Sequence, residues 1–84
     1  MKIAIIGQGY VGLTIAVGAA GAGHNVVGFD VNADLVKALN SGVSHIEGIS
    51  NSQLKGFLSN NSYTASTEAP SINGCDVVVI AVPT

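Results

Sequence analysis

The chain has 84 residues, of which 48% are hydrophobic and 10% are charged, and its formal net charge is −2. This length allows one small domain or a piece of a larger one, so a complete enzyme with its own substrate pocket is not expected. The net charge, with only three lysines and arginines, argues against nucleic acid or an anionic membrane as the partner. The single cysteine fits a reducing compartment, and we therefore expect a cytoplasmic location.

The first part of the chain predicts a strand, a glycine-rich turn and a helix. Lys2–Ile6 is an isoleucine-rich run, typical of a parallel strand buried on both faces. The GQGYVG segment then places Gly7, Gly9 and Gly12 at the G-x-G-x-x-G spacing of a dinucleotide-binding turn. A helix is expected from Tyr10 to Ala22, and Gly12 would let it pack closely on the strand. Its N-terminus would offer unpaired N–H groups to phosphates.

The later elements alternate between strand and helix. They are a strand over Asn25–Asp30, a helix over Ala33–Leu39, a loop over 43–52, a short helix over Ser52–Leu58, a short strand over Ser62–Ser66, a turn or short helical segment over Glu68–Ile72, and a fully apolar buried strand over Val77–Val82. This succession predicts an α/β fold, namely the N-terminal half of a Rossmann-type doubly wound parallel sheet with strand order 3-2-1-4. The glycine turn and the end of the last strand would then be neighbours at the carboxyl edge, where ligands bind.

Asp30 is the candidate ribose-binding residue. It ends the second predicted strand, about 20 residues beyond the glycine turn, where a carboxylate accepts both hydroxyls of an adenosine ribose. A carboxylate there repels a 2′-phosphate, and neither Val31 nor Asn32 offers a positive charge to bind one, so NAD is favoured over NADP. The alternative is that Asp30 only caps the helix that starts near Asn32.

Three further residues are candidates for contact with the cofactor. Tyr10 and Val11 occupy the variable positions of the turn and are expected to cover the pyrophosphate or face the nicotinamide side. They could instead pack at the helix start. Thr84 follows the last predicted strand, where its hydroxyl can reach the cofactor. The alternative for Thr84 is an ordinary turn at a strand end.

The remaining reactive side chains do not suggest a catalytic or metal site. Cys75 precedes the last predicted strand, at the end opposite the ligand edge, and no histidine lies near it in the sequence. We therefore expect a core or loop cysteine. His24 and His45 are too isolated to indicate a metal site.

Several segments together resemble the UDP-glucose/GDP-mannose dehydrogenase family over essentially the whole chain. They are KIAIIGQGYVGL at the start, GFDVN, LNSG at 39–42, HIEGIS at 45–50 and DVVVIAVPT at 76–84. The HIE loop looks most like the branch that acts on UDP-N-acetylhexosamines. The resemblance implies a two-step oxidation of the C6 alcohol of a UDP-sugar to a carboxylate, with two NAD molecules and a covalent stage on a cysteine. The matching cofactor-binding positions are Gly7, Gly9, Tyr10, Val11, Gly12, Asp30 and Thr84.

The resemblance also sets the expected organisation of the protein. Residues 1–84 would be the N-terminal part of the NAD-binding domain of a longer enzyme, inactive by themselves, because the catalytic cysteine and the sugar-nucleotide domain would lie beyond Thr84. We expect the complete enzyme to be a homo-oligomer. One position departs from the family pattern: Leu35 stands where a lysine or arginine is usual.

Two other functions remain open from the residues alone. One is the NAD-binding half of a hydroxy-acid or hydroxyacyl dehydrogenase, which uses the same cofactor fold. The other is a non-catalytic, nucleotide-sensing regulatory module. An active-site cysteine further along the chain would favour the sugar-nucleotide enzyme over both.

Overall fold

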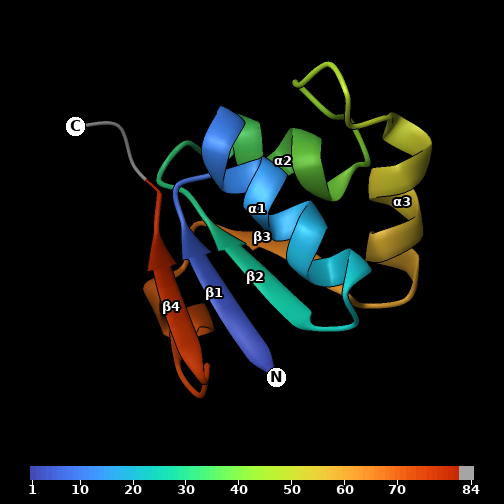
Figure 1. The fold of residues 1–84 in the computed structure, drawn as a ribbon. Helices are drawn as coiled ribbons and strands as arrows, with labels where there is room; N and C mark the ends of the chain where they lie inside the picture. The colour runs from blue at the N-terminus through green and yellow to red at the C-terminus, as the bar shows by residue number, and fades with distance from the viewer. Residues whose placement is uncertain (82–84) are drawn as a thin grey trace.

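Four parallel strands form one sheet in the order β3-β2-β1-β4 in the computed structural model, which describes residues 1–81 (Figure 1). The elements are, in chain order, β1 (Lys2–Ile6), α1 (Tyr10–Gly21), β2 (Asn25–Phe29), α2 (Ala33–Asn40), α3 (Asn51–Ser59), β3 (Tyr63–Ser66), the 3-10 helix η1 (Ala69–Ile72) and β4 (Val77–Ile80). The strand order and the parallel pairing of all neighbouring strands confirm the predicted α/β, Rossmann-like fold.

The predicted elements are all present, and most of their ends differ from the prediction by one residue at most. The exception is the end of β4, where the strand stops at Ile80 and the predicted end, Val82, lies outside the described residues. The difference that matters most for the site is the end of β2, which the sequence predicts at Asp30. Because β2 ends at Phe29, Asp30 is the first residue beyond the strand and stands at the carboxyl edge of the sheet.

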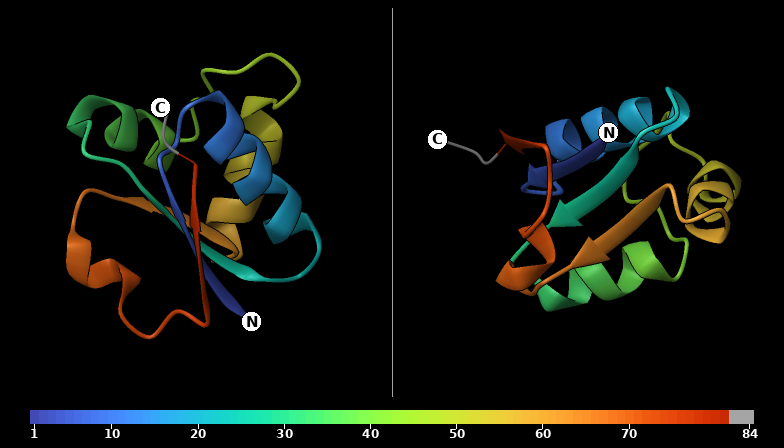
Figure 2. Two further views of the ribbon diagram at one scale, coloured as in Figure 1. Left: turned by 60° about the vertical axis from the view of Figure 1, so that its left-hand side comes forward. Right: turned by 90° about the horizontal axis from the view of Figure 1, so that it is seen from below.

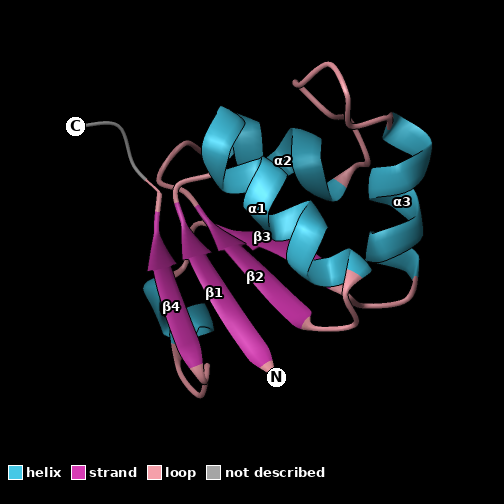
Figure 3. Ribbon diagram, in the orientation of Figure 1, coloured by secondary structure: helices cyan, strands magenta, loops and turns pink. Residues whose placement is uncertain are grey.

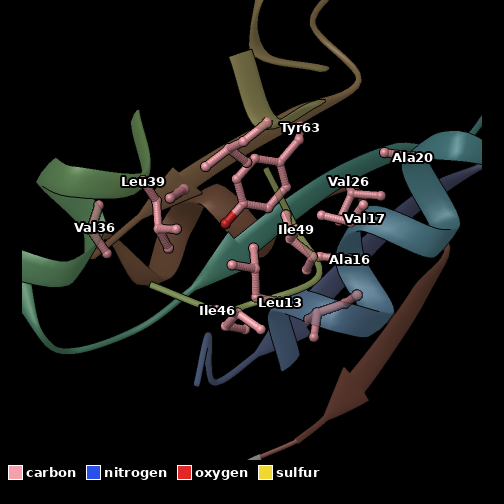
Figure 4. Close-up of a cluster of buried hydrophobic side chains, with 13 residues drawn as sticks. Leu13, Ala16, Val17, Ala20, Val26, Val36, Leu39, Ile46, Ile49 and Tyr63 are labelled. Atoms are coloured by element: carbon pink, nitrogen blue, oxygen red, sulfur yellow. The ribbon is translucent and has the colours of Figure 1, made fainter. Parts of the chain in front are cut away.

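The three α-helices share one hydrophobic cluster with one face of the sheet. Its members are Ile5, Leu13, Ala16, Val17, Ala20, Val26, Val36, Leu39, Ile46, Ile49, Leu54, Tyr63 and Ala65. Figure 4 shows the Tyr63 ring between the side chains from α1 and those from α2. The hydrophobic core therefore lies between this face of the sheet and the three α-helices.

The opposite face of the sheet is covered far less. Figure 2 shows η1 on the other side of the strands from α1, and η1 contacts β2 there. On β4 the side chains of Val78 and Ile80, which share a face, are 50% and 73% exposed. The prediction of a buried last strand is therefore wrong for this chain, because β4 is an edge strand and the described residues place no α-helix on its outer face.

The carboxyl ends of the strands meet at one edge, as Figure 3 shows for β4, β1 and β2. Backbone hydrogen bonds continue the strand pairing just past the strand ends: Gly7 donates to the Phe29 carbonyl, Asp30 to Ser66, and Ala81 to Ile6. The glycine turn is thereby held against the ends of both neighbouring strands. Within residues 1–81, no helix is long and apolar enough to cross a membrane.

Candidate dinucleotide-binding site

The glycine turn between β1 and α1 needs its glycines for three different physical reasons. Gly7 has a φ of 94°, a region that favours glycine because it carries no Cβ. A Cβ on Gly12 would lie 2.7 Å from the Gly7 carbonyl carbon and closer still to its oxygen, so only glycine lets α1 approach β1 this closely. Gly9 has no atom within 4 Å of the place of a Cβ, which leaves its backbone open to a ligand.

The N-terminus of α1 is free to receive an anion. Gly9 is its N-cap, no side chain caps the helix, and its first turn carries no acidic residue. By contrast, Asn32 caps α2 and Ser50 caps α3 through their side-chain oxygens. The first N–H groups of α1 therefore keep their hydrogen-bonding capacity and the positive end of the helix dipole, as a bound phosphate requires.

The Asp30 carboxylate is held at the mouth of this turn by two backbone N–H groups. The Gln8 N–H donates to Oδ2 at 2.8 Å, and the Asn32 N–H donates to Oδ1 at 2.9 Å. An ionised carboxylate has about four lone-pair sites, so both oxygens can still accept a hydroxyl. The alternative role of Asp30 as the cap of α2 is wrong, because the Asn32 Oδ1 accepts the Leu35 N–H at 3.1 Å.

A small pocket of about 90 Å³ opens beside this carboxylate. It lies at the carboxyl ends of β1 and β2 and is lined by Ile6, Gly7, Phe29, Asp30 and Val31. Its lining is apolar apart from the carboxylate and backbone. The pocket is too small for a whole nucleoside, but an apolar lining with a carboxylate at one side suits a group that carries hydroxyls at one end.

The other predicted contact residues have different outcomes. Tyr10 and Val11 lie in the first turn of α1 and are 71% and 57% exposed, so they do not pack at the helix start. Their contact with a cofactor stays a prediction. Thr84 lies outside the described residues. Leu35 is half-buried and packs against the hydrophobic cluster, so its side chain adds to the core.

Gln8 is the site residue that sequence reasoning missed. Its side chain is fully buried beneath the turn, where its Oε1 accepts the Tyr63 hydroxyl at 2.7 Å. Its Nε2 donates to the Gly7 carbonyl at 2.9 Å and to the Ile5 carbonyl at 3.2 Å. The only signal in the sequence was a polar residue between two glycines, and nothing linked it to a tyrosine 55 positions away.

The sequence does not predict a catalytic or metal-binding role for Cys75, His24 or His45. Cys75 is half-buried and lies before β4, at the amino end of the strands, as predicted. The described residues contain no group of three or more histidine, cysteine and acidic side chains that could hold a metal ion. The candidate site therefore consists of the turn, the α1 N-terminus and Asp30.

Comparisons with known proteins agree with this geometry. All 84 residues match the UDP-glucose/GDP-mannose dehydrogenase family, NAD binding domain. The chain is 38% identical to UDP-N-acetyl-D-mannosamine dehydrogenase of Pyrococcus horikoshii, with 100% of this chain and 20% of that protein covered. It is 37% identical to the UDP-glucose 6-dehydrogenase AglM of Haloferax volcanii, with the same coverage.

Solved structures give the same relationship. A UDP-N-acetylmannosamine dehydrogenase structure from Pyrococcus horikoshii superposes with a TM-score of 0.92 at 37% identity, over 98% of this chain and 20% of that one. A ternary complex of GDP-mannose dehydrogenase from Pseudomonas aeruginosa gives a TM-score of 0.91 at 31% identity, over 100% and 20%. The chain thus spans about a fifth of the length of these relatives. With its uncapped helix N-terminus after the glycine turn and a carboxylate held beside that turn, the chain belongs to the UDP-glucose/GDP-mannose dehydrogenase family and matches the family's NAD-binding domain.

Proposed function

We propose that the complete protein in which this chain occurs is an NAD-dependent UDP-sugar 6-dehydrogenase, and that residues 1–84 hold the adenosine and pyrophosphate part of NAD. Several similar relatives are dehydrogenases of UDP-N-acetylmannosamine or UDP-N-acetylglucosamine, which favours a UDP-N-acetylhexosamine as substrate. The observation that carries the proposal is the Asp30 carboxylate, held by two N–H groups beside the uncapped N-terminus of α1.

Each part of the site has a separate task in holding the cofactor. The first N–H groups of α1 bind the pyrophosphate, and Gly9 leaves the approach open. Asp30 accepts the hydroxyls of the adenosine ribose, and its charge disfavours a 2′-phosphate at that position. Tyr10 and Val11, exposed in the first turn of α1, cover the bound dinucleotide. NAD supplies the oxidising capacity when bound, and the groups that react with the sugar would lie beyond residue 84.

Removing the Asp30 carboxylate tests the ribose assignment. In the complete protein, Asp30→Ala should weaken NAD binding by about tenfold to a hundredfold, since hydrogen bonds to a charged group contribute about 1.5–3 kcal/mol. The matched control is Asp34→Ala, which removes the same charge from the exposed first turn of α2. Titration calorimetry measures both affinities. Equal NAD affinity in wild type and Asp30→Ala would remove the assignment.

The substrate class needs a second experiment. The complete protein should reduce NAD when it is given a UDP-N-acetylhexosamine or UDP-glucose, and the absorbance of NADH measures this directly. A hydroxy-acid or hydroxyacyl dehydrogenase would instead reduce NAD with a hydroxy acid or a hydroxyacyl thioester and not with a UDP-sugar. A nucleotide-sensing module would bind NAD without turnover. We also propose a cytoplasmic location, which the single cysteine suggests and cell fractionation would test. The family resemblance suggests that the complete protein is a homo-oligomer, and sedimentation analysis would test that state.

A further inference from the structure

A hydrogen-bonded pair of buried polar side chains lies directly beneath the NAD site and has no assigned role. Among the described residues, the Gln8 amide and the Tyr63 hydroxyl are the only polar side-chain groups on buried residues. A buried amide is costly unless its donors and its acceptor are all paired. Here both Nε2 hydrogens meet carbonyls, of Gly7 and Ile5, and Oε1 meets the Tyr63 hydroxyl. The pairing is therefore complete.

This pairing admits only one orientation of the amide. The two carbonyls can only accept, so Nε2 must face them and Oε1 must face the Tyr63 hydroxyl, which must then donate. Burial, together with the negative charge of Asp30, raises the pKa of the Tyr63 phenol, so the hydroxyl keeps its proton. Tyr63 thus acts as a permanent donor that anchors Gln8 to β3, the strand two places away from β1.

The fold leaves a space for this pair. A Cβ on Gly28 would lie 2.5 Å from the Gln8 side-chain carbonyl carbon and 2.7 Å from the Tyr63 hydroxyl oxygen. Glycine at this point of β2 is therefore required for the two side chains to meet across the sheet. Three strands thus contribute to one contact: β1 leads into Gln8, β2 supplies Gly28, and β3 supplies Tyr63.

The backbone of the same residue holds the ribose-binding carboxylate. The Gln8 N–H donates to the Asp30 Oδ2 at 2.8 Å, while the Gln8 side chain is tied down by three hydrogen bonds. A peptide group anchored in this way presents its N–H in one direction, and the carboxylate that accepts from it is oriented in turn. We infer that Tyr63 and Gln8 are positioning residues that orient Asp30 toward the adenosine ribose, an inference that rests on the proposed function.

The test compares NAD with an analogue that lacks the adenosine 2′-hydroxyl. In the complete wild-type protein, calorimetry should show the analogue binding about tenfold more weakly than NAD, because one hydrogen bond to the carboxylate is lost. In Tyr63→Phe and in Gln8→Leu, NAD binding should weaken and this ratio should fall to about twofold or less. In an Asp30→Ala background, either substitution should have no further effect on the ratio.

A purely structural role would give a different result. It would weaken both ligands equally and leave the ratio at its wild-type value, and that outcome overturns the inference. Tyr63→Phe removes a single oxygen, so it carries the test if Gln8→Leu does not fold. The matched control is Thr64→Val, which removes a hydroxyl from the neighbouring, exposed position of β3 and should change neither affinity. If the wild-type protein binds neither NAD nor the analogue, the proposed function fails as well. If the wild-type protein and both variants all bind NAD about tenfold more tightly than the analogue, only this inference fails.

Discussion

Two glycines of α1 should respond to the same substitution with opposite signs. At Gly12, a Cβ would lie 2.7 Å from the Gly7 carbonyl carbon, whereas no atom lies within 4 Å of the place of a Cβ at Gly18. Ordinary contacts between carbon atoms begin near 3.5 Å, so Gly12→Ala would push α1 away from β1 by about 1 Å or more. The obstacle is backbone, which cannot rotate out of the way as a flexible side chain can.

The cost follows from what α1 packs. Its buried side chains are Leu13, Ala16, Val17 and Ala20, and a gap of about 1 Å loses a quarter to a half of the dispersion energy of each contact. Overpacking of this kind typically costs about 1–3 kcal/mol, and we expect the upper end for Gly12→Ala. Gly18→Ala should instead stabilise the protein by about 0.5–1 kcal/mol, because alanine loses less backbone entropy in a helix.

Denaturant unfolding of the complete protein, followed by circular dichroism, measures the difference. The two variants should differ by about 3.5–4 kcal/mol in unfolding free energy, with wild type between them. Equal effects of the two substitutions, or a neutral Gly12→Ala, would refute the close approach of α1 to the turn. Gly12→Ala should also lower NAD affinity, since it displaces the helix N-terminus.

Two further predictions concern stability. The raised pKa of Tyr63 means that the folded state keeps a proton that the unfolded state loses near pH 10, so the stability is fully present below about pH 10 and is lost as the pH rises above it. Urea titrations across this range should show the slope in wild type but not in Tyr63→Phe; a slope that persists in the variant would contradict the assignment. Asn40 pairs with both backbone groups of Ala65 on the edge strand β3, at 2.8 and 2.9 Å. Asn40→Ala should therefore cost about 1–3 kcal/mol in thermal or urea unfolding, and Asn40→Asp should also destabilise, because it sets a carboxylate oxygen against the Ala65 carbonyl; an unchanged midpoint in Asn40→Ala would show that solvent replaces the pair.

Short-range patterns were sufficient to predict the elements and their order. The isoleucine-rich run of β1, the glycine spacing and the acidic residue after β2 each depend on neighbours within about 20 positions. Right-handed crossovers, together with the dinucleotide-binding glycine spacing, favour the strand order 3-2-1-4 for such a succession, and the structure has that order. The position of Asp30 beside the turn follows from the same rule, because parallel strands end at one edge.

The apolar run of β4 shows where such reasoning stops. A run of valine and isoleucine indicates a strand with apolar faces, but exposure depends on what lies against those faces. In the described residues β4 has a neighbour on one side only, and Ile80 is 73% exposed. Periodicity within one strand carries no information about its neighbours, so the prediction of burial was wrong here.

The sequence by itself determined the strand–turn–helix unit, the parallel sheet and the carboxylate at its edge, because these depend on local conformational preference and on the handedness of crossovers. Only the tertiary structure decided that Gln8 turns inward, that Tyr63 reaches it from β3, and that Asn32 rather than Asp30 caps α2. The Gln8–Tyr63 contact joins residues 55 positions apart through the space left by Gly28. Such pairings depend on the distances between packed elements, which no spacing along the chain encodes.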